Sequence, residues 1–92
     1  MIDDKKIAKA SKLLKALGNA KRLEIMYLLD KKEHKVGELE KKVDLSQSAL
    51  SQHLAILRAA DVVSTRRQAQ TIFYSLKGEA AAKLLHFLDR VV

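Results

Sequence analysis

The apolar residues of this chain change their spacing near residue 62, and that change restricts the fold more than any other feature. Before Val62 they recur every three or four residues in four separate segments, as in amphipathic helices. From Val62 to Leu76, β-branched and aromatic residues alternate with polar ones, which predicts two paired strands. Helical spacing returns after Gly78. The sequence therefore predicts a mainly α fold with one small β-hairpin (α+β).

Capping and breaking residues set the expected boundaries. Gly18-Asn19 indicates a helix stop followed by an N-cap, and the Ser46 hydroxyl can cap a helix by accepting from a first-turn N–H. We expect strands in "VVSTRR" and "QTIFYSL", with the connecting turn near Gln68-Ala69. The lysine-rich "KKEHK" is expected to be a connector. The expected helices cover residues 4–17, 20–30, 36–43, 46–60 and 78–92.

A two-turn helix, the tight turn "DLS" and a longer helix match the helix-turn-helix plan, although the usual turn glycine is missing. With the hairpin after it, the order is helix, helix, helix-turn-helix, hairpin, helix. This order predicts a winged helix-turn-helix. A chain of 92 residues has room for one domain, so residues 1–92 are expected to form it alone.

The net charge limits the classes of partner that this chain is expected to bind. Eighteen Lys and Arg against eleven Asp and Glu give a net charge of +7, which suits nucleic acid first and an anionic membrane second. A solvated basic surface is the other interpretation.

The absence of cysteine excludes disulfides and thiolate metal sites. No apolar run reaches the roughly 18 residues of a membrane span, and "MIDDKKIAKA" lacks a signal-peptide core. We expect a cytoplasmic protein with no membrane partner.

The segment "LSQSALSQHLAILR" is two-sided when drawn as a helix. Leu50, Leu54 and Leu57 fall on one side. At 100° per residue, the other side is an arc of about 140° with one charge, formed by Gln47, Ser48, Ser51, Gln52, Ala55, Arg58 and Ala59.

The chemistry of this polar side distinguishes among partners. A membrane-surface helix would carry flanking lysines, and a merely solvated helix would carry Glu/Lys pairs four residues apart. Glutamine and serine are side chains that hydrogen-bond base edges in the major groove of double-stranded DNA. The sequence therefore favours base reading by residues 46–60, with a polar solvated face as the alternative.

Polar residues also cluster in the predicted hairpin, or wing, at residues 62–76. They could contact a minor groove or the phosphate backbone. The alternative is an edge hairpin made polar to prevent aggregation. The residues are Arg66, Arg67, Gln68 and Gln70.

The chain resembles the ArsR/SmtB family of winged-helix repressors, and within it the branch of HlyU, BigR and NolR. The resemblance runs from "LLKALGNAKRLEIMYLL" through "VGEL" and "LSQSALSQHLAILR" to "VSTRRQAQTIFYSL". It implies a homodimer that binds an imperfect palindrome and usually represses transcription. By position, it implies groove contacts at Gln47, Ser48, Ser51 and Gln52. His53 is a weaker candidate, since it borders the apolar side of the helix and could equally be packed.

The resemblance also implies that the first and last helices form the dimer interface. Their apolar faces are wider than a monomer of this size needs, which agrees with a two-fold pairing. Alternatively, both faces pack on the core of their own chain. The expected interface residues are Ile7, Leu13, Leu14, Leu17, Leu84, Leu88 and Val91.

Many members of the family sense metal, but the expected ligands are incomplete here. Lys35 and Gly37 stand where the resemblance places thiolates in the third helix, and neither can ligate. His86 and Asp89 match half of a last-helix zinc site, with His34 as a distant third candidate. The positions of the other half fall on Phe73 and Ser75. We expect no cofactor and no metal, and instead a solvated His86–Asp89 pair.

Two further features of the sequence reduce the number of possible functions. The cysteine-pair switch that the branch implies cannot form in a chain without cysteine. No phosphate loop, nucleophile with a base or paired carboxylates indicates an enzyme. The inducing signal is not apparent from the sequence. The alternatives to sequence-specific regulation are a winged-helix protein-interaction module, non-specific DNA compaction, or a metal-responsive repressor using His86 and Asp89.

Overall fold

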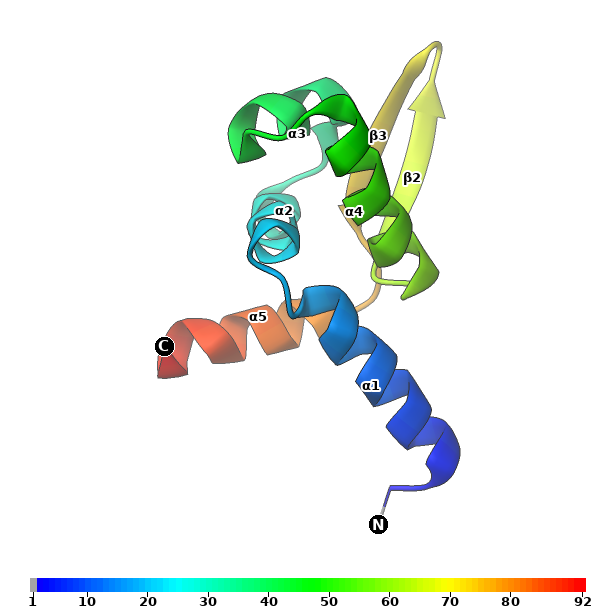
Figure 1. Ribbon diagram of the computed structural model, residues 1–92, viewed down its shortest axis with the longest axis vertical. Helices are drawn as coiled ribbons and strands as arrows, with labels where there is room; N and C mark the ends of the chain where they lie inside the picture. The colour runs from blue at the N-terminus through cyan, green and yellow to red at the C-terminus, as the bar shows by residue number, and fades with distance from the viewer. Residues whose placement is uncertain (1) are drawn as a thin grey trace.

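The computed structural model describes residues 2–92 and confirms the winged helix-turn-helix (Figure 1). Each predicted helix and both hairpin strands are present within one or two residues of their expected bounds. The helices are α1 Asp4–Leu17, α2 Ala20–Lys31, α3 Val36–Val43, α4 Gln47–Ala59 and α5 Ala80–Val91. The strands are β1 His34–Lys35, β2 Val63–Gln68 and β3 Thr71–Leu76.

Side-chain caps start the helices where the sequence predicts them. The Asn19 side chain accepts a hydrogen bond from the backbone N–H of Arg22 at 3.1 Å, at the start of α2. The Ser46 hydroxyl accepts from the N–H of Ala49 at 3.2 Å, at the start of α4. Each cap satisfies one N–H that the first turn of a helix leaves without a backbone partner.

The connector "KKEHK" was predicted wrongly, because part of it is a strand. Among the described residues, β1 joins the hairpin in an antiparallel sheet of order β1-β3-β2. His34 pairs with Tyr74 and Lys35 with Phe73. Two residues are too short to show a strand period, and the inward side chain here is a histidine, so no apolar pattern marks the strand. The sheet ties α3 to the wing.

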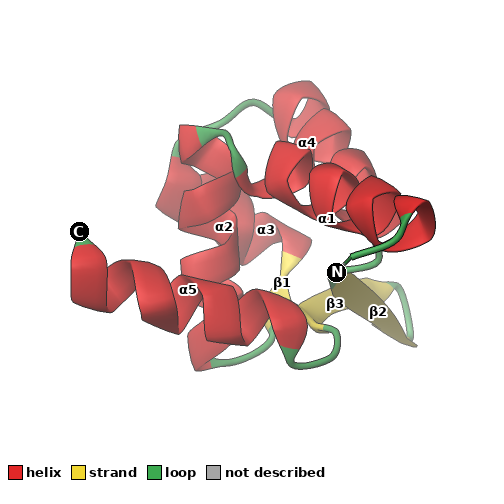
Figure 2. Ribbon diagram, turned by 90° about the horizontal axis from the view of Figure 1, so that it is seen from below, coloured by secondary structure: helices red, strands yellow, loops and turns green. Residues whose placement is uncertain are grey.

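Helix α2 lies at the centre of the molecule and contacts α1, α3, α4, α5 and β3 (Figure 2). Its buried side chains pack with those of every other helix. Within the described residues, no helix combines the length and hydropathy needed to cross a membrane. The largest fully buried apolar side chains are Ile25, Met26, Leu39, Val43, Leu50, Leu57 and Leu85.

The turn between α3 and α4 explains the missing glycine. Asp44 ends α3 in the left-handed conformation, with φ 54° and ψ 58°, where glycine is usual. The N–H of Leu45 then bonds the carbonyl of Glu40. Aspartate enters this region more readily than most residues, but still with some strain.

Replacing Asp44 with glycine should therefore stabilise the fold by about 1 kcal/mol, because glycine adopts φ 54° without the strain of a Cβ. Urea denaturation followed by circular dichroism measures this. Asp44→Ala is the matched control and should be neutral or destabilising. Equal stabilisation by both variants would show that the carboxylate, and not the backbone, is responsible.

Candidate nucleic-acid interface

Helix α4 separates its side chains as the sequence predicts. Leu50, Leu54 and Leu57 are at most 3% exposed and pack in the core. The polar side is open to solvent along the whole helix. Its exposed residues are Gln47, Ser48, Ser51, Gln52, Ala55, Arg58 and Ala59.

The rest of the fold holds α4 rigidly from behind. The helix contacts α1, α2, α3 and β2, and it lies between α3 and the hairpin (Figure 1). Its polar face is thus a straight, supported surface beside the wing. A helix of 13 residues is about 20 Å long, enough to place its exposed side chains in one major groove.

His53 differs from its neighbours on α4, because its ring is engaged inside the molecule. Nδ1 lies 3.1 Å from Nη1 of Arg22 on α2. Burial, and then the charge of Arg22, lower the pKa of His53 below its ordinary value of 6.5. The ring is therefore neutral at pH 7.

Arg66 is the most constrained of the candidate residues in the wing. Its guanidinium lies 4.3 Å from the ring centroid of Phe73 on β3. Its Nη2 donates to the carboxylate of Glu33 at 2.6 Å, and Nη1 donates to the side chain of Gln68 at 2.9 Å. Arg66 and Gln68 are thus held on one face of the hairpin, next to a carboxylate.

Arg67 projects from the opposite face, since successive side chains of a strand alternate. It pairs across the hairpin with Ile72, whereas Arg66 pairs with Phe73. Gln70 is at the tip, in the loop between β2 and β3, and Ala69 before it has a positive φ of 56°. The structure therefore divides the predicted wing cluster between two faces and the tip.

The candidate metal ligands do not come together. Nε2 of His86 lies 2.8 Å from a carboxylate oxygen of Asp30, so the expected His86–Asp89 pair was wrong. Among residues 2–92, no three His, Asp or Glu side chains form a cluster that could hold a metal ion.

The other two candidates have different neighbours. Asp89 faces Tyr27 on α2, and burial together with the Asp89 carboxylate raises the pKa of that phenol. His34 is only 2% exposed, with Nδ1 2.9 Å from the Lys32 carbonyl and Nε2 3.1 Å from the Lys42 ammonium. Its ring is thus part of the β1–α3 junction.

The end of the molecule opposite the wing tip carries exposed apolar side chains on α1 and α5 (Figure 1). Ile7, Leu14 and Val91 are 50%, 58% and 59% exposed. Leu17 instead packs in the core of its own chain, so it has little surface left for a partner. Leu13, Leu84 and Leu88 are half-buried. Phe87, which the sequence analysis did not single out, is 49% exposed.

The sequence analysis missed two residues that contact the candidate nucleic-acid interface. Arg22 looked like an ordinary surface residue in "NAKRL", and Glu33 lay in the supposed connector. Both act through partners more than 30 positions away, His53 and Arg66. Local spacing carries no signal for such contacts.

Comparisons with known proteins agree with this geometry. A family model described as "Bacterial regulatory protein, arsR family" matches residues 19–65. The transcriptional activator HlyU of Vibrio cholerae is 48% identical over 96% of this chain and 82% of that protein. The solved structure of HlyU from the same species superposes with a TM-score of 0.90 at 47% identity, covering 97% of each chain.

Two further relatives are similar over most of this chain. The nodulation protein NolR of Rhizobium meliloti is 54% identical over 89% of this chain and 67% of that protein. The biofilm growth-associated repressor of Agrobacterium fabrum is 44% identical over 92% of this chain and 73% of that protein. The fold and the two-sided α4 thus define a winged helix-turn-helix regulator. Within that class, the chain belongs to the arsR family of bacterial regulatory proteins.

The Glu33–Arg66 contact predicts a pH response in the wing. Hydrogen bonding to Arg66 lowers the pKa of Glu33 below its ordinary 4.5. The stabilisation is therefore complete above pH 4.5 and is lost as the pH falls through the lower folded value. An NMR titration of the Glu33 carboxyl should show this depressed pKa, and Arg66→Ala should return it to the ordinary value.

Arg67→Ala is the matched control, because Arg67 lies on the other face of the same strand. It should leave the pKa of Glu33 where it is. Equal shifts in the two variants would mean that general wing charge, and not the contact, lowers the pKa.

Proposed function

We propose that this protein is a sequence-specific DNA-binding transcriptional regulator that acts as a homodimer on an imperfect palindrome. Helix α4 enters the major groove, and the hairpin contacts the adjacent minor groove or phosphate backbone. The observation that carries this proposal is the exposed, nearly uncharged glutamine and serine face of α4, supported by a buried leucine face. Such a face offers hydrogen bonds to base edges with little non-specific attraction of its own.

Contacts to phosphate would come from charges around α4. The net charge of +7 supplies long-range attraction to a polyanion. Arg67, on the face of the hairpin opposite Arg66, and Gln70, at the tip, are both exposed. Arg58, near the end of α4, is an exposed cation on the reading face. In this arrangement the arginines position the protein, and the glutamines and serines read sequence.

The apolar end of the molecule supports the dimer. Helices α1 and α5 lie at the end of the molecule away from the wing tip. The exposed apolar side chains on them include Ile7 and Leu14 of α1 and Phe87 and Val91 of α5. Exposed apolar surface of this kind is usually covered in the functional assembly.

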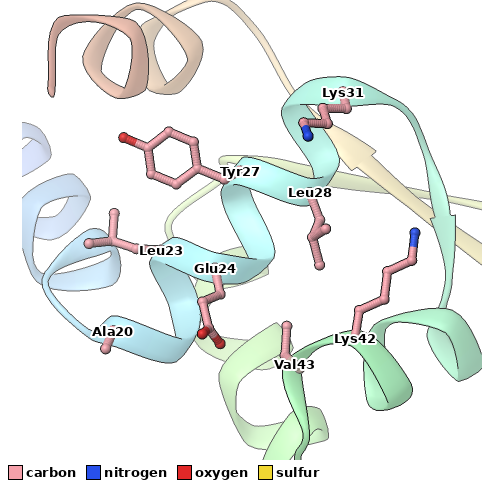
Figure 3. A pocket seen from close by; sticks show the side chains of 8 residues that line it. All are labelled: Ala20, Leu23, Glu24, Tyr27, Leu28, Lys31, Lys42 and Val43. Carbon is pink, nitrogen blue, oxygen red and sulfur yellow. The ribbon is translucent and has the colours of Figure 1, made fainter. Parts of the chain in front are cut away.

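Helix α2 adds apolar side chains beside those of α5. Leu23 and Tyr27 line a hollow together with Leu88 of α5 and Val92, the residue that follows α5. They also line a pocket of about 530 Å³ facing α3, with Leu28 and Val43 (Figure 3). Leu23 and Tyr27 belong to both hollows, so apolar side chains extend from α5 onto α2, and charged Glu24, Lys31 and Lys42 also line the pocket that faces α3.

We propose repression as the regulatory effect. The Agrobacterium relative is named a repressor, whereas HlyU is named an activator. A dimer that covers a promoter palindrome blocks polymerase directly. Activation would require the same protein to displace another repressor or to recruit polymerase from a neighbouring site.

Gln47→Ala should weaken binding to the selected duplex by about 1–3 kcal/mol for each half-site and relax the base preference at one position of each half-site. The cognate duplex is first obtained by selection from a random library with the wild-type protein. Fluorescence anisotropy at 50 and 200 mM salt then gives affinity and its salt dependence. Because Gln47 is uncharged, the salt slope should not change.

Arg67→Ala is the comparison for this test. It should weaken binding to all duplexes similarly and reduce the salt slope of the dimer by about 1.8, because one phosphate contact is lost in each of the two protomers. If wild-type affinity is insensitive to salt and no sequence is selected, the proposal is wrong, and the alternative of a protein-interaction module is favoured.

Leu14→Glu should abolish the dimer, because it would bury a carboxylate in the proposed apolar interface. Analytical ultracentrifugation should then show a monomer with an unchanged far-ultraviolet circular dichroism spectrum. Lys12→Glu, on the same helix and also exposed, is the control: it changes the charge more than Leu14→Glu does and should remain dimeric. A Leu14→Glu protein that is still dimeric would place the interface elsewhere.

A further inference from the structure

The side chain of Arg22 joins three helices at one point. Arg22 lies in the first turn of α2, and its guanidinium points back to the end of α1. Its Nε donates to the carbonyl of Ala16 at 2.5 Å, and Nη2 donates to that of Lys15 at 3.1 Å. Its Nη1 lies 3.1 Å from Nδ1 of His53 on α4.

The two carbonyls belong to the last turn of α1, where backbone acceptors lack partners within the helix. A cation there also interacts favourably with the negative end of the helix dipole. Arg22 therefore fixes the end of α1. The planar guanidinium presents its N–H groups in a rigid fork, so fixing α1 also fixes the direction of the N–H that meets His53.

The contact with His53 defines the state of the ring. A guanidinium nitrogen only donates, so Nδ1 of His53 must accept and Nε2 must carry the proton. Protonated histidine has no acceptor and could not make this bond. Because burial and Arg22 lower the pKa of His53, the bond contributes above pH 6.5 and is lost as the pH falls through the lower folded value.

We propose that Arg22 and His53 are positioning residues that fix α4 relative to α1, and thereby the separation of the two recognition helices in the dimer. The inference rests on the proposed function, in which α1 belongs to the dimer interface and α4 to the DNA interface. If α1 is held by the partner, a change in the α1–α4 angle moves each recognition helix relative to its copy. Half-site spacing then depends on a contact inside each protomer.

Two substitutions at His53 separate this role from direct contact with DNA. His53→Asn places an amide oxygen near the position of Nδ1, so it can still accept from Arg22. His53→Gln extends further and places its polar group near the position of Nε2. If His53 is a positioning residue, His53→Asn should retain operator binding and His53→Gln should not. If His53 contacts a base or phosphate through Nε2, the opposite result is expected.

The experiment measures affinity for the selected operator and for versions with one to three base pairs added or removed at its centre. Wild type and His53→Asn should prefer one spacing and agree within about threefold. His53→Gln should bind the best spacing about tenfold more weakly, with a flatter preference, because loss of the bond to Arg22 lowers the population of the α1–α4 arrangement that fits the operator. Arg22→Lys should resemble His53→Gln if it folds, since one ammonium cannot replace three fixed donors.

A second measurement needs no DNA. The chain has no cysteine, so Ala55→Cys, at an exposed position of α4, introduces a single site for a spin label in each protomer. Pulsed electron resonance should give a narrow distance distribution for the wild-type dimer and for His53→Asn, and a broader one for His53→Gln.

The outcomes separate this inference from the proposed function. A wild type that selects no duplex, or that shows no distance between labels, would overturn the proposed function and this inference with it. A wild type that binds one spacing, while His53→Gln keeps the same spacing preference and distance distribution, would overturn this inference alone. Loss of binding in His53→Asn but not in His53→Gln would assign His53 to DNA contact.

Discussion

The burial of α2 against every other helix is the constraint on which the rest of the structure depends. Ile25 and Met26 are completely buried, and α2 contacts α1, α3, α4 and α5 as well as the sheet. Each surrounding helix packs some of its apolar side chains against this helix. The polar face of α4 and a second group of apolar side chains on α1 and α5 remain exposed. The positions of both proposed interfaces thus follow from one packing requirement.

Most of the fold could be predicted because its signals are local. Asn19 and Ser46 stand directly before the helices that they cap, and the leucines of α4 repeat at helical spacing. The missing glycine of the turn did not mislead, since Asp44 adopts the same left-handed conformation. Strand β1 escaped prediction because two residues carry no period, and because its buried side chain is a histidine satisfied by Lys32 and Lys42.

Only the part of the candidate site that follows from helix geometry could be predicted from the sequence. The exposed residues of α4 follow from a rotation of 100° per residue. The contacts of Arg66 and His53 cannot be predicted in this way. Arg66 bonds Glu33 and His53 bonds Arg22, and folding brings these partners together from distant positions in the sequence. His86 illustrates the same limit, since it bonds Asp30 of α2 and not its helical neighbour Asp89. Sequence periodicity identifies which side chains face outward, but it does not identify the contacts that hold them.

The ion pair of Glu33 with Arg66 has a consequence for how such a regulator can diverge. Glu33 lies in the segment before α3, outside the hairpin, and its carboxylate neutralises the charge of Arg66 in the wing. Replacing this glutamate by a neutral residue would increase the positive charge of the wing while every residue of the hairpin stayed the same. If the proposed function holds, natural selection could therefore adjust the affinity for DNA through a position outside both α4 and the hairpin, while the residues that read the bases stay the same.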